Sequence, residues 1–432
     1  MPRAMTLDRK IADTYTAILT EELRPAMGCT EPIAIAYAAA ILRQALGKVP
    51  CRVKAGFSGN IIKNVKSVIV PMTGGKHGIE SAIAAGLLSG EPERSLEVLK
   101  ALPENSGELI DALLSECDMK VEMLSGERAF EIFLSGEADG REARVRILDT
   151  HTNITEVSVC GEDITAKYAR EGCGDGFSSA NADRAMLDVE KIVEFASTVE
   201  LDTLAPLLRR QIELNMDIAR EGLTGKWGAS IGAIILSIGD DVSRRARAYA
   251  AAGSDARMSG CEKPVCIISG SGNQGITASV PVKIYADELG VSEEKLLRAL
   301  IVSDLVTVHQ KTGIGTLSAY CGAISAGVGA GAGICYLHGG GFYEIAHTVV
   351  NAVAILSGTI CDGAKPSCAA KIAMSVEAGI MGFEMSRRGS QFYGGDGIVT
   401  KGVENTIRNI GRLAKDGMLE TDREIIGIML ED

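Results

Sequence analysis

Hydrophobic and polar positions alternate with two different periods in different parts of the chain. Between residues 50 and 160, short runs such as CRVKAGFS and AFEIFLSG alternate partly every second residue and are separated by turn signals. This pattern is typical of strands that are buried on one face. GEADGR predicts a hairpin turn between two of the runs, and GIESAIAAGLLSG predicts a helix. This part of the chain therefore predicts a mixed α/β domain with an antiparallel sheet.

Helical periodicity dominates the rest of the chain. Residues 8–25 carry apolar side chains at helical spacing, and residues 33–46 are apolar nearly all round, which predicts an amphipathic helix followed by a buried one. From about Asp183 onward almost every segment has a helical period. The stretch 169–182 is rich in Gly, Ser and Asn and is typical of a linker between two domains.

These patterns predict an α+β fold with a small mixed α/β domain, built on an antiparallel sheet, and a larger all-helical domain. The expected divisions are N-terminal helices and a GCTEP loop that pack on the helical domain (1–47), an α/β domain (48–180) and the helical domain (181–432).

Charge and the N-terminus narrow the class of protein. The 44 Lys and Arg residues and 56 Asp and Glu residues leave a net charge of −12, and no basic run is visible, which argues against a nucleic-acid partner. The N-terminus lacks the apolar core of a signal peptide, so we expect a cytoplasmic protein. In that reducing compartment the eleven cysteines are expected as metal ligands, catalytic thiols or packing residues, and not as disulfides.

One charge-free stretch, residues 312–343, is long enough to cross a membrane. It consists mostly of Gly, Ala and Ser, and its flanks lack the charge asymmetry and aromatic belts of a membrane protein. We therefore expect a buried helix pair with small-residue contacts, and no membrane partner.

Three cysteines lie on loops of small residues. Cys321 opens the Gly/Ala-rich stretch, and Cys361 and Cys368 lie in GTICDGAKPSC. Thiolate is the usual ligand of iron–sulfur clusters, and three ligands would leave one iron open. The alternative is that they are buried packing residues, because free cysteine behaves as a small hydrophobe. Packing is the role expected for Cys51, Cys117, Cys160, Cys173, Cys261, Cys266 and Cys335.

Several stretches together resemble the iron–sulfur L-serine dehydratase α-domain superfamily, and in particular its L-cysteine desulfidase family of UPF0597 type. FSGNIIKN and GGKHGIESA resemble that branch too. The main stretches are GCTEP (28–32), SGSGNQGITASVPV (269–282), SAYCGAISAGVGAGAG (318–333) and GTICDGAKPSCAAKIA (358–373). The superfamily's fold, an α/β domain joined to a cluster-bearing helical domain, agrees with the pattern above.

The resemblance implies that Cys321, Cys361 and Cys368 bind a [4Fe–4S] cluster with one iron open to substrate, and that Cys29 is a functional thiol close to it. Serine dehydratases carry a serine-rich SSHT-type motif where this chain has GCTEP, which favours the cysteine-cleaving branch. Cys29 lies just ahead of a helix, where the helix dipole favours a thiolate, so it is interpreted as the base or a temporary iron ligand. Glu31 is the alternative base.

The substrate's carboxylate needs a binding site as well. SGSGNQGITASV predicts a turn whose backbone N–H groups, at a helix starting near Ile276, face an anion. Other polar residues in these motifs are interpreted as further substrate contacts, although Lys311 is equally compatible with a solvated lysine at a helix end. The predicted substrate-binding residues are Ser58, Asn60, Lys63, Asn64, His77, Ser271, Asn273, Gln274 and Lys311.

The implied reaction is α,β-elimination from L-cysteine to pyruvate, hydrogen sulfide and ammonia. No lysine motif indicates pyridoxal phosphate, so the metal is expected to act as the electrophile. Two alternatives stay open: an L-serine or L-threonine dehydratase with the same cluster, and a non-catalytic cysteine or sulfide sensor. The expected partner is a small amino acid; a homodimer is compatible with the sequence.

Overall fold

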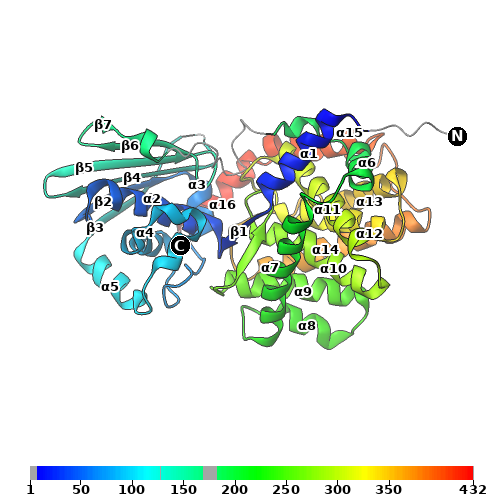
Figure 1. The fold of residues 1–432 in the computed structure, drawn as a ribbon, viewed down its shortest axis with the longest axis horizontal. Helices are drawn as coiled ribbons and strands as arrows, with labels where there is room; N and C mark the ends of the chain where they lie inside the picture. Colours follow the sequence, from blue (N-terminus) through cyan, green and yellow to red (C-terminus); the bar gives the residue numbers. More distant parts are fainter. Residues whose placement is uncertain (1–6, 127, 169–181, 432) are drawn as a thin grey trace.

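A computed structural model describes residues 7–126, 128–168 and 182–431. The chain forms a smaller α/β part and a larger helical part, which lie side by side in Figure 1. Each part has a hydrophobic core of its own, one built from residues between Ile33 and Val157 and the other mainly from residues beyond Leu187. The α+β prediction is confirmed. The predicted linker 169–182 lies, except for Ala182, outside the described residues.

The α/β part is built on a six-stranded sheet in the order β3–β2–β4–β5–β6–β7. Only β2 and β3 are parallel, and the other neighbours are antiparallel. Asp139 and Gly140 form the predicted hairpin turn, both with positive φ (51° and 73°), which matches the twist of the flanking strands. The strands are β2 (Arg52–Phe57), β3 (Asp118–Met123), β4 (Glu131–Ala138), β5 (Arg141–Leu148), β6 (Ile154–Val159) and β7 (Glu162–Asp163).

Helices pack against this sheet and against each other. The buried helix α2 packs closely on α4, because a Cβ on Gly86 of α4 would lie 2.1 Å from the carbonyl oxygen of Ala36. Glycine is therefore required at position 86 for the helices to approach. The helices are α2 (Thr30–Leu46), α3 (Gly59–Val65), α4 (Gly78–Ser89), the 3₁₀ segment η1 (Pro92–Ala101), α5 (Ser106–Glu116) and the short η2 (Thr165–Lys167).

The helical part begins with α1 and a short strand, and continues after residue 182. Strand β1 (Arg24–Met27) pairs antiparallel with β8 (Pro264–Ile267). The helices are α1 (Arg9–Glu22), η3 (Arg184–Met186), α6 (Val189–Thr198), α7 (Ala205–Thr224), α8 (Ile231–Ile238), α9 (Val242–Met258), α10 (Gly272–Leu289), α11 (Glu293–Ile314), α12 (Gly322–Leu337), α13 (Phe342–Leu356), α14 (Cys368–Arg387), α15 (Val403–Arg412), the π-turn Leu413–Gly417 and α16 (Leu419–Glu431).

Two features differ from the predicted domains. The helical part is not all-helical, because the β1–β8 pair lies within it; four-residue strands are too short to show a two-residue period. The N-terminal helices also separate. Helix α1 packs on the helical core, as expected, but the side chains of α2 belong to the α/β core. The GCTEP loop thus lies where the chain passes from one core to the other.

The charge-free stretch forms α12, the buried centre of the helical part. Small residues let its neighbours approach to backbone contact. A Cβ on Gly327 would lie 2.2 Å from the carbonyl oxygen of Ser375 in α14, and a Cβ on Gly329 would lie 2.2 Å from Oγ1 of Thr307 in α11. None of the helices among the described residues is both long and apolar enough to span a bilayer.

The C-terminal helix ties the two parts together. In Figure 1, α16 (red) reaches from the helical part to α3 of the α/β part. Lys63, only 1% exposed at its side chain, pairs with Asp422 of α16 at 2.5 Å, and Asn60 donates to the same carboxylate at 2.6 Å. Gly363 packs on the backbone of Lys63, since a Cβ there would lie 2.2 Å from its carbonyl oxygen. The two cores are therefore held at a fixed junction.

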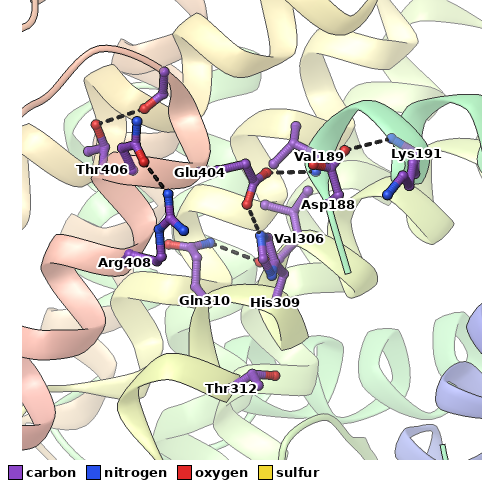
Figure 2. Close-up of polar contacts among 12 residues, drawn as sticks. Asp188, Val189, Lys191, Val306, His309, Gln310, Thr312, Glu404, Thr406 and Arg408 are labelled. Carbon is purple, nitrogen blue, oxygen red and sulfur yellow. Dashed lines mark hydrogen bonds and ion pairs between the residues drawn. The ribbon is translucent and has the colours of Figure 1, made fainter. Parts of the chain in front are cut away.

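A second polar tie joins α11, α15 and α6 within the helical part. Figure 2 shows Glu404 of α15 between His309 and the first turn of α6. Its Oε2 lies 2.6 Å from Nε2 of His309, and its Oε1 accepts the N–H of Val189 at 2.9 Å. Burial alone would raise the pKa of Glu404, but the hydrogen bond and charge of His309 outweigh it and hold the pKa below its usual value.

This contact predicts a pH-dependent loss of stability in Glu404→Gln. The lowered folded-state pKa contributes stability that is present above the unfolded pKa, about 4.3, and is lost as the pH falls through the folded pKa. Because the side chain is 33% exposed, we expect a loss of only about 1 kcal/mol at pH 7. Urea unfolding midpoints of wild type and variant, measured from pH 7 downward, should converge at acid pH. The exposed Glu420→Gln is the control, and equal midpoints for both variants at pH 7 would contradict the role of Glu404.

Candidate iron–sulfur and substrate site

A cavity of about 110 Å³ lies at the junction of the two cores. The α/β part and its leading loop supply Cys29, Glu31, Asn64 and His151, and the helical part supplies the remaining lining. The polar residues lining it from the helical part are Arg257, Ser269, Ser271, Asn273, Gln274, Lys311, Thr316, Ser318, Tyr320, Cys321, Cys361, Cys368 and Lys371. The cavity therefore combines the motifs that are farthest apart in the sequence.

Two of the predicted ligand cysteines are brought together by a short backbone pairing. Tyr320 and Ile360 form an isolated antiparallel bridge. The N–H of Cys321 donates to the carbonyl of Thr359 at 3.0 Å, and the N–H of Cys361 donates to that of Ala319 at 2.6 Å. Forty residues of sequence separate the two cysteines, and this bridge is what places both on one wall.

The third cysteine approaches from a helix end. Cys368 is the first residue of α14, and Cys321 is the N-cap of α12. Helix N-termini favour thiolate because of their free N–H groups and dipole. In the protein alone, however, burial and the neighbouring Cys361 raise the pKa of Cys321 to about 12, and burial also raises the pKa of Cys368. Metal binding at these thiols must therefore release protons.

The donor set fits an iron–sulfur cluster in its chemistry. Three free thiols line one wall of the cavity, and thiolate is the ligand that such clusters use. Within the described ranges no three His, Cys, Asp or Glu side chains are already converged on one point. The cysteines that would hold a cluster are thus Cys321, Cys361 and Cys368, with some adjustment of their side chains.

Positive charge surrounds these thiols. Lys311 is buried and donates to the carbonyl of Gly315 at 2.6 Å; burial lowers its pKa to about 8, although the thiols of Cys361 and Cys321 oppose this shift. Lys371 of α14 donates to Asp362 at 2.5 Å. Burial would raise the pKa of Asp362, but the hydrogen bonds of Lys365 and Lys371 lower it to about 2. These ammonium groups can balance the negative charge of bound thiolates.

The GCTEP motif forms a hydrogen-bonded unit at the start of α2 and packs near Cys368. Sγ of Cys29 lies 3.1 Å from Oε2 of Glu31, and Nδ2 of Asn64 donates to Oε1 of the same carboxylate at 3.0 Å. Thr30 donates to the carbonyl of Gly270 at 2.8 Å, which joins the loop to the turn before α10. Cys29, Glu31 and Asn64 are all buried. The unit presents one thiol and one carboxylate to the cavity.

The protonation of this unit differs from the helix-dipole expectation. Cys29 is the N-cap of α2, yet burial and the charge of Glu31 raise its pKa well above its ordinary value. Burial would raise the pKa of Glu31 as well, but His151, the Cys29 hydrogen bond and Arg257 together lower it. At neutral pH the unit is therefore a thiol beside a carboxylate, and not a resident thiolate. Desolvation outweighs the helix dipole here.

Two buried site residues have no recognisable signal in the sequence. His151 lies in the loop after β5, far from every motif, and burial lowers its pKa below its usual value. Arg257 lies in the last turn of α9. Both line the cavity only because the two domains meet there.

A hydrogen bond to Glu22 of α1 fixes the turn before α10. Ser269 has positive φ (47°) without being glycine, and its N–H donates to Oε2 of Glu22 at 2.8 Å. Helix α10 starts at Gly272 and not near Ile276 as predicted. Asn273 and Gln274 therefore lie in its first turn, since Ser271 already serves as the N-cap.

Five of the predicted substrate-binding residues line the cavity: Asn64, Ser271, Asn273, Gln274 and Lys311. The other four do not. Ser58 bonds the backbone of Ala129 and Glu131, Lys63 and Asn60 bind Asp422, and His77 is the N-cap of α4. The motif FSGNIIKN is helical from Gly59, so only one side of it, including Asn64, faces the site.

The remaining cysteines differ in how far they are buried. Cys117, Cys261, Cys266 and Cys335 are buried as expected of packing residues, but Cys51, just before β2, and Cys160, in the turn after β6, are exposed. Cys173 lies outside the described residues.

The fold and this cavity define a two-domain α+β protein with a cysteine-lined site at the domain junction. The family model described as "Serine dehydratase alpha chain" matches residues 93–427. The chain therefore belongs to the serine dehydratase alpha-chain family, which is associated with iron–sulfur dehydratases, and the predicted resemblance is confirmed.

Relatives among curated proteins narrow the group further. A UPF0597 protein of Desulfitobacterium hafniense is 56% identical over 421 residues, covering 96% of each chain. A UPF0597 protein of Treponema denticola is 44% identical over 435 residues, covering 99% of this chain and 100% of the relative. One of Lachnoclostridium phytofermentans is 46% identical over 414 residues, covering 96% and 98%.

Proposed function

We propose that this protein is an iron–sulfur lyase that converts L-cysteine to pyruvate, hydrogen sulfide and ammonia. The observation that carries the proposal is that one cavity gathers three free cysteines and the Cys29–Glu31 pair. Membership of the serine dehydratase alpha-chain family supports β-elimination from an amino acid. The GCTEP motif in place of an SSHT-type motif supports cysteine as the substrate.

A [4Fe–4S] cluster held by Cys321, Cys361 and Cys368 would supply an open iron, a Lewis acid suited to a soft sulfur leaving group. The protein's own residues supply the remaining needs of the reaction. The first turn of α10 orients the substrate with its N–H groups.

The Cys29–Glu31 pair supplies the base. Glu31 is ionised at neutral pH and accepts a hydrogen bond from the thiol of Cys29 across 3.1 Å. Transfer of that proton to Glu31 gives the thiolate only as a minor form of the pair, because burial raises the pKa of Cys29. The thiolate takes the α-proton of the substrate, which restores the thiol. The electron pair of the Cα–H bond forms the Cα=Cβ bond, and the C–S bond breaks with its pair on sulfur, so that hydrosulfide leaves and takes the proton held by Glu31. The released aminoacrylate tautomerises and takes up water, which gives pyruvate and ammonia.

The experiment measures sulfide and pyruvate released from L-cysteine by anaerobically reconstituted protein, with L-serine in a parallel reaction. We expect equal amounts of sulfide and pyruvate, and much slower pyruvate release from serine. Hydroxide is a poorer leaving group than sulfide and needs a proton donor beside the β-oxygen.

The second candidate is an L-serine or L-threonine dehydratase, favoured by the printed name of the family model. Pyruvate from serine with little sulfide from cysteine would move the protein to that activity. Release of neither product by an iron-loaded protein would reject both lyase activities and leave the cysteine or sulfide sensor.

A further inference from the structure

The first turn of α10 presents the cavity with polar groups that lack partners. Arg257 is 3% exposed and lines the cavity, and its buried Nε has no hydrogen-bond partner among the described residues. Among the same residues, buried Oδ1 of Asn273 and Oε1 of Gln274 accept no hydrogen bond. One donor group and two acceptor atoms are therefore unsatisfied at the same cavity.

Such groups are costly in a folded protein. A guanidinium removed from water without a hydrogen-bonded counter-charge destabilises the fold, and most buried polar atoms in native proteins have partners. The charge of Glu31 acts on Arg257, but that carboxylate is already bonded to Cys29 and Asn64. A ligand that completes these groups gives a physical reason for their presence.

Close contacts locate the unsatisfied groups relative to the cysteine loops. A Cβ on Gly272 would lie 2.4 Å from Nε of Arg257, so the guanidinium lies against the N-terminus of α10. A Cβ on Gly322 would lie 2.8 Å from the amide carbon of Gln274, so that side chain packs beside Cys321. The turn therefore extends from the arginine to the predicted cluster wall.

We propose that Arg257 is the residue that binds the α-carboxylate of the substrate and so makes the site specific for an amino acid. Arg257 and the free N–H groups of α10 bind the α-carboxylate, and the amide oxygens of Asn273 and Gln274 accept hydrogen bonds from the α-ammonium. The side chain of the ligand then extends toward the cysteine loops. This inference rests on the proposed function for the reaction, and it concerns the residue that binds the carboxylate and not the bond that breaks.

The test uses ligands that cannot undergo elimination. L-Alanine carries both charged groups, L-lactate lacks the ammonium and ethylamine lacks the carboxylate. Binding to the wild-type protein is measured by thermal shift and calorimetry, without turnover. We expect L-alanine to bind at least about tenfold more tightly than either analogue, because each loses charge-assisted hydrogen bonds. Equal binding of lactate and alanine, or no binding of alanine, would overturn the proposal.

The matching variant is Arg257→Gln. We expect it to weaken L-alanine binding at least about tenfold, while its melting temperature without ligand equals or exceeds that of wild type, because an unpaired buried charge has been removed. Arg245→Gln is the control, since Arg245 lies on the same helix but pairs with Glu288 at the surface. Unchanged alanine binding, or a lowered melting temperature without ligand, would contradict the role.

Arg257→Lys covers the case in which the glutamine variant does not fold. It keeps the charge but loses the planar fork, so alanine binding should lie between wild type and the glutamine variant; binding equal to wild type would contradict the assignment.

The outcome of these binding experiments can be told apart from the outcome of the activity test of the proposed function. A protein that binds alanine through Arg257 but releases no sulfide refutes the desulfidase activity alone, and sulfide release that is indifferent to Arg257 refutes this inference alone.

Discussion

Replacement of Cys361 by serine is expected to remove the cluster and the activity together. Cys361 is one of three thiols on the cavity wall, and its backbone is fixed by the pairing with Ala319. A serine hydroxyl is a poor ligand for the irons of such a cluster, and two cysteines leave a second iron without a protein ligand. Because changes to mere supporting residues already weaken metal sites by about 10–100-fold, loss of a ligand should exceed that range.

The measurement is iron and acid-labile sulfide per chain after anaerobic reconstitution, together with the visible absorption of the cluster. Cys51→Ser is the matched control, because that cysteine is exposed and distant from the cavity lining. Cys51→Ser should load and react like wild type. A Cys361→Ser protein that retains full iron content and cluster colour would refute the ligand assignment, whatever its activity.

Replacement of Cys29 by serine is expected to abolish turnover and leave most of the iron in place. Cys29 lines the cavity from the loop between the two cores, and its sulfur contacts Glu31. A general base typically contributes about 10²–10⁴-fold to the rate, and a serine hydroxyl is far less acidic than a thiol. The rate of sulfide release should fall by a factor in this range, while the iron content changes little.

The companion variant is Glu31→Gln, which keeps the volume of the side chain and removes its charge. We expect a similar loss of rate, because the neutral amide cannot take the thiol proton. Cys117→Ser is the control, as a buried cysteine of the α/β core outside the cavity lining. Normal turnover by Cys29→Ser would exclude the base, and loss of iron in step with activity would make Cys29 a ligand instead.

The two pairs of variants separate binding of the cluster from proton transfer. Under the proposed roles, cluster loss is expected from changes in the loops before α12 and α14, which belong to the helical part. Loss of proton transfer is expected from changes in the loop before α2, which leads into the α/β part. The cavity is lined by both parts, and the Lys63–Asp422 pair between α3 and α16 is one of the contacts that hold them together.

Local sequence patterns were sufficient to predict much of the fold. The two-residue period between residues 50 and 160 predicted the sheet, and the positive-φ turn at Asp139 and Gly140 follows from its own composition. These features depend on neighbours in the sequence, so the sequence carries them directly. The strands β1 and β8 were missed because four residues are too few for a period, and α2 was assigned to the wrong core because an all-round apolar helix does not indicate which neighbour covers it.

For the candidate site, too, some features depend on neighbours in the sequence and others depend on tertiary packing. The sequence by itself determined which motifs bring reactive or polar groups: the cysteines of two loops, Cys29 with Glu31, and the turn before α10. Only the tertiary structure decided which of them meet. It brought His151 and Arg257 to the cavity, turned Ser58, Asn60, Lys63 and His77 away from it, and kept Cys29 protonated by burial. Convergence and desolvation arise from the packing of two cores, and no local pattern of residues encodes them.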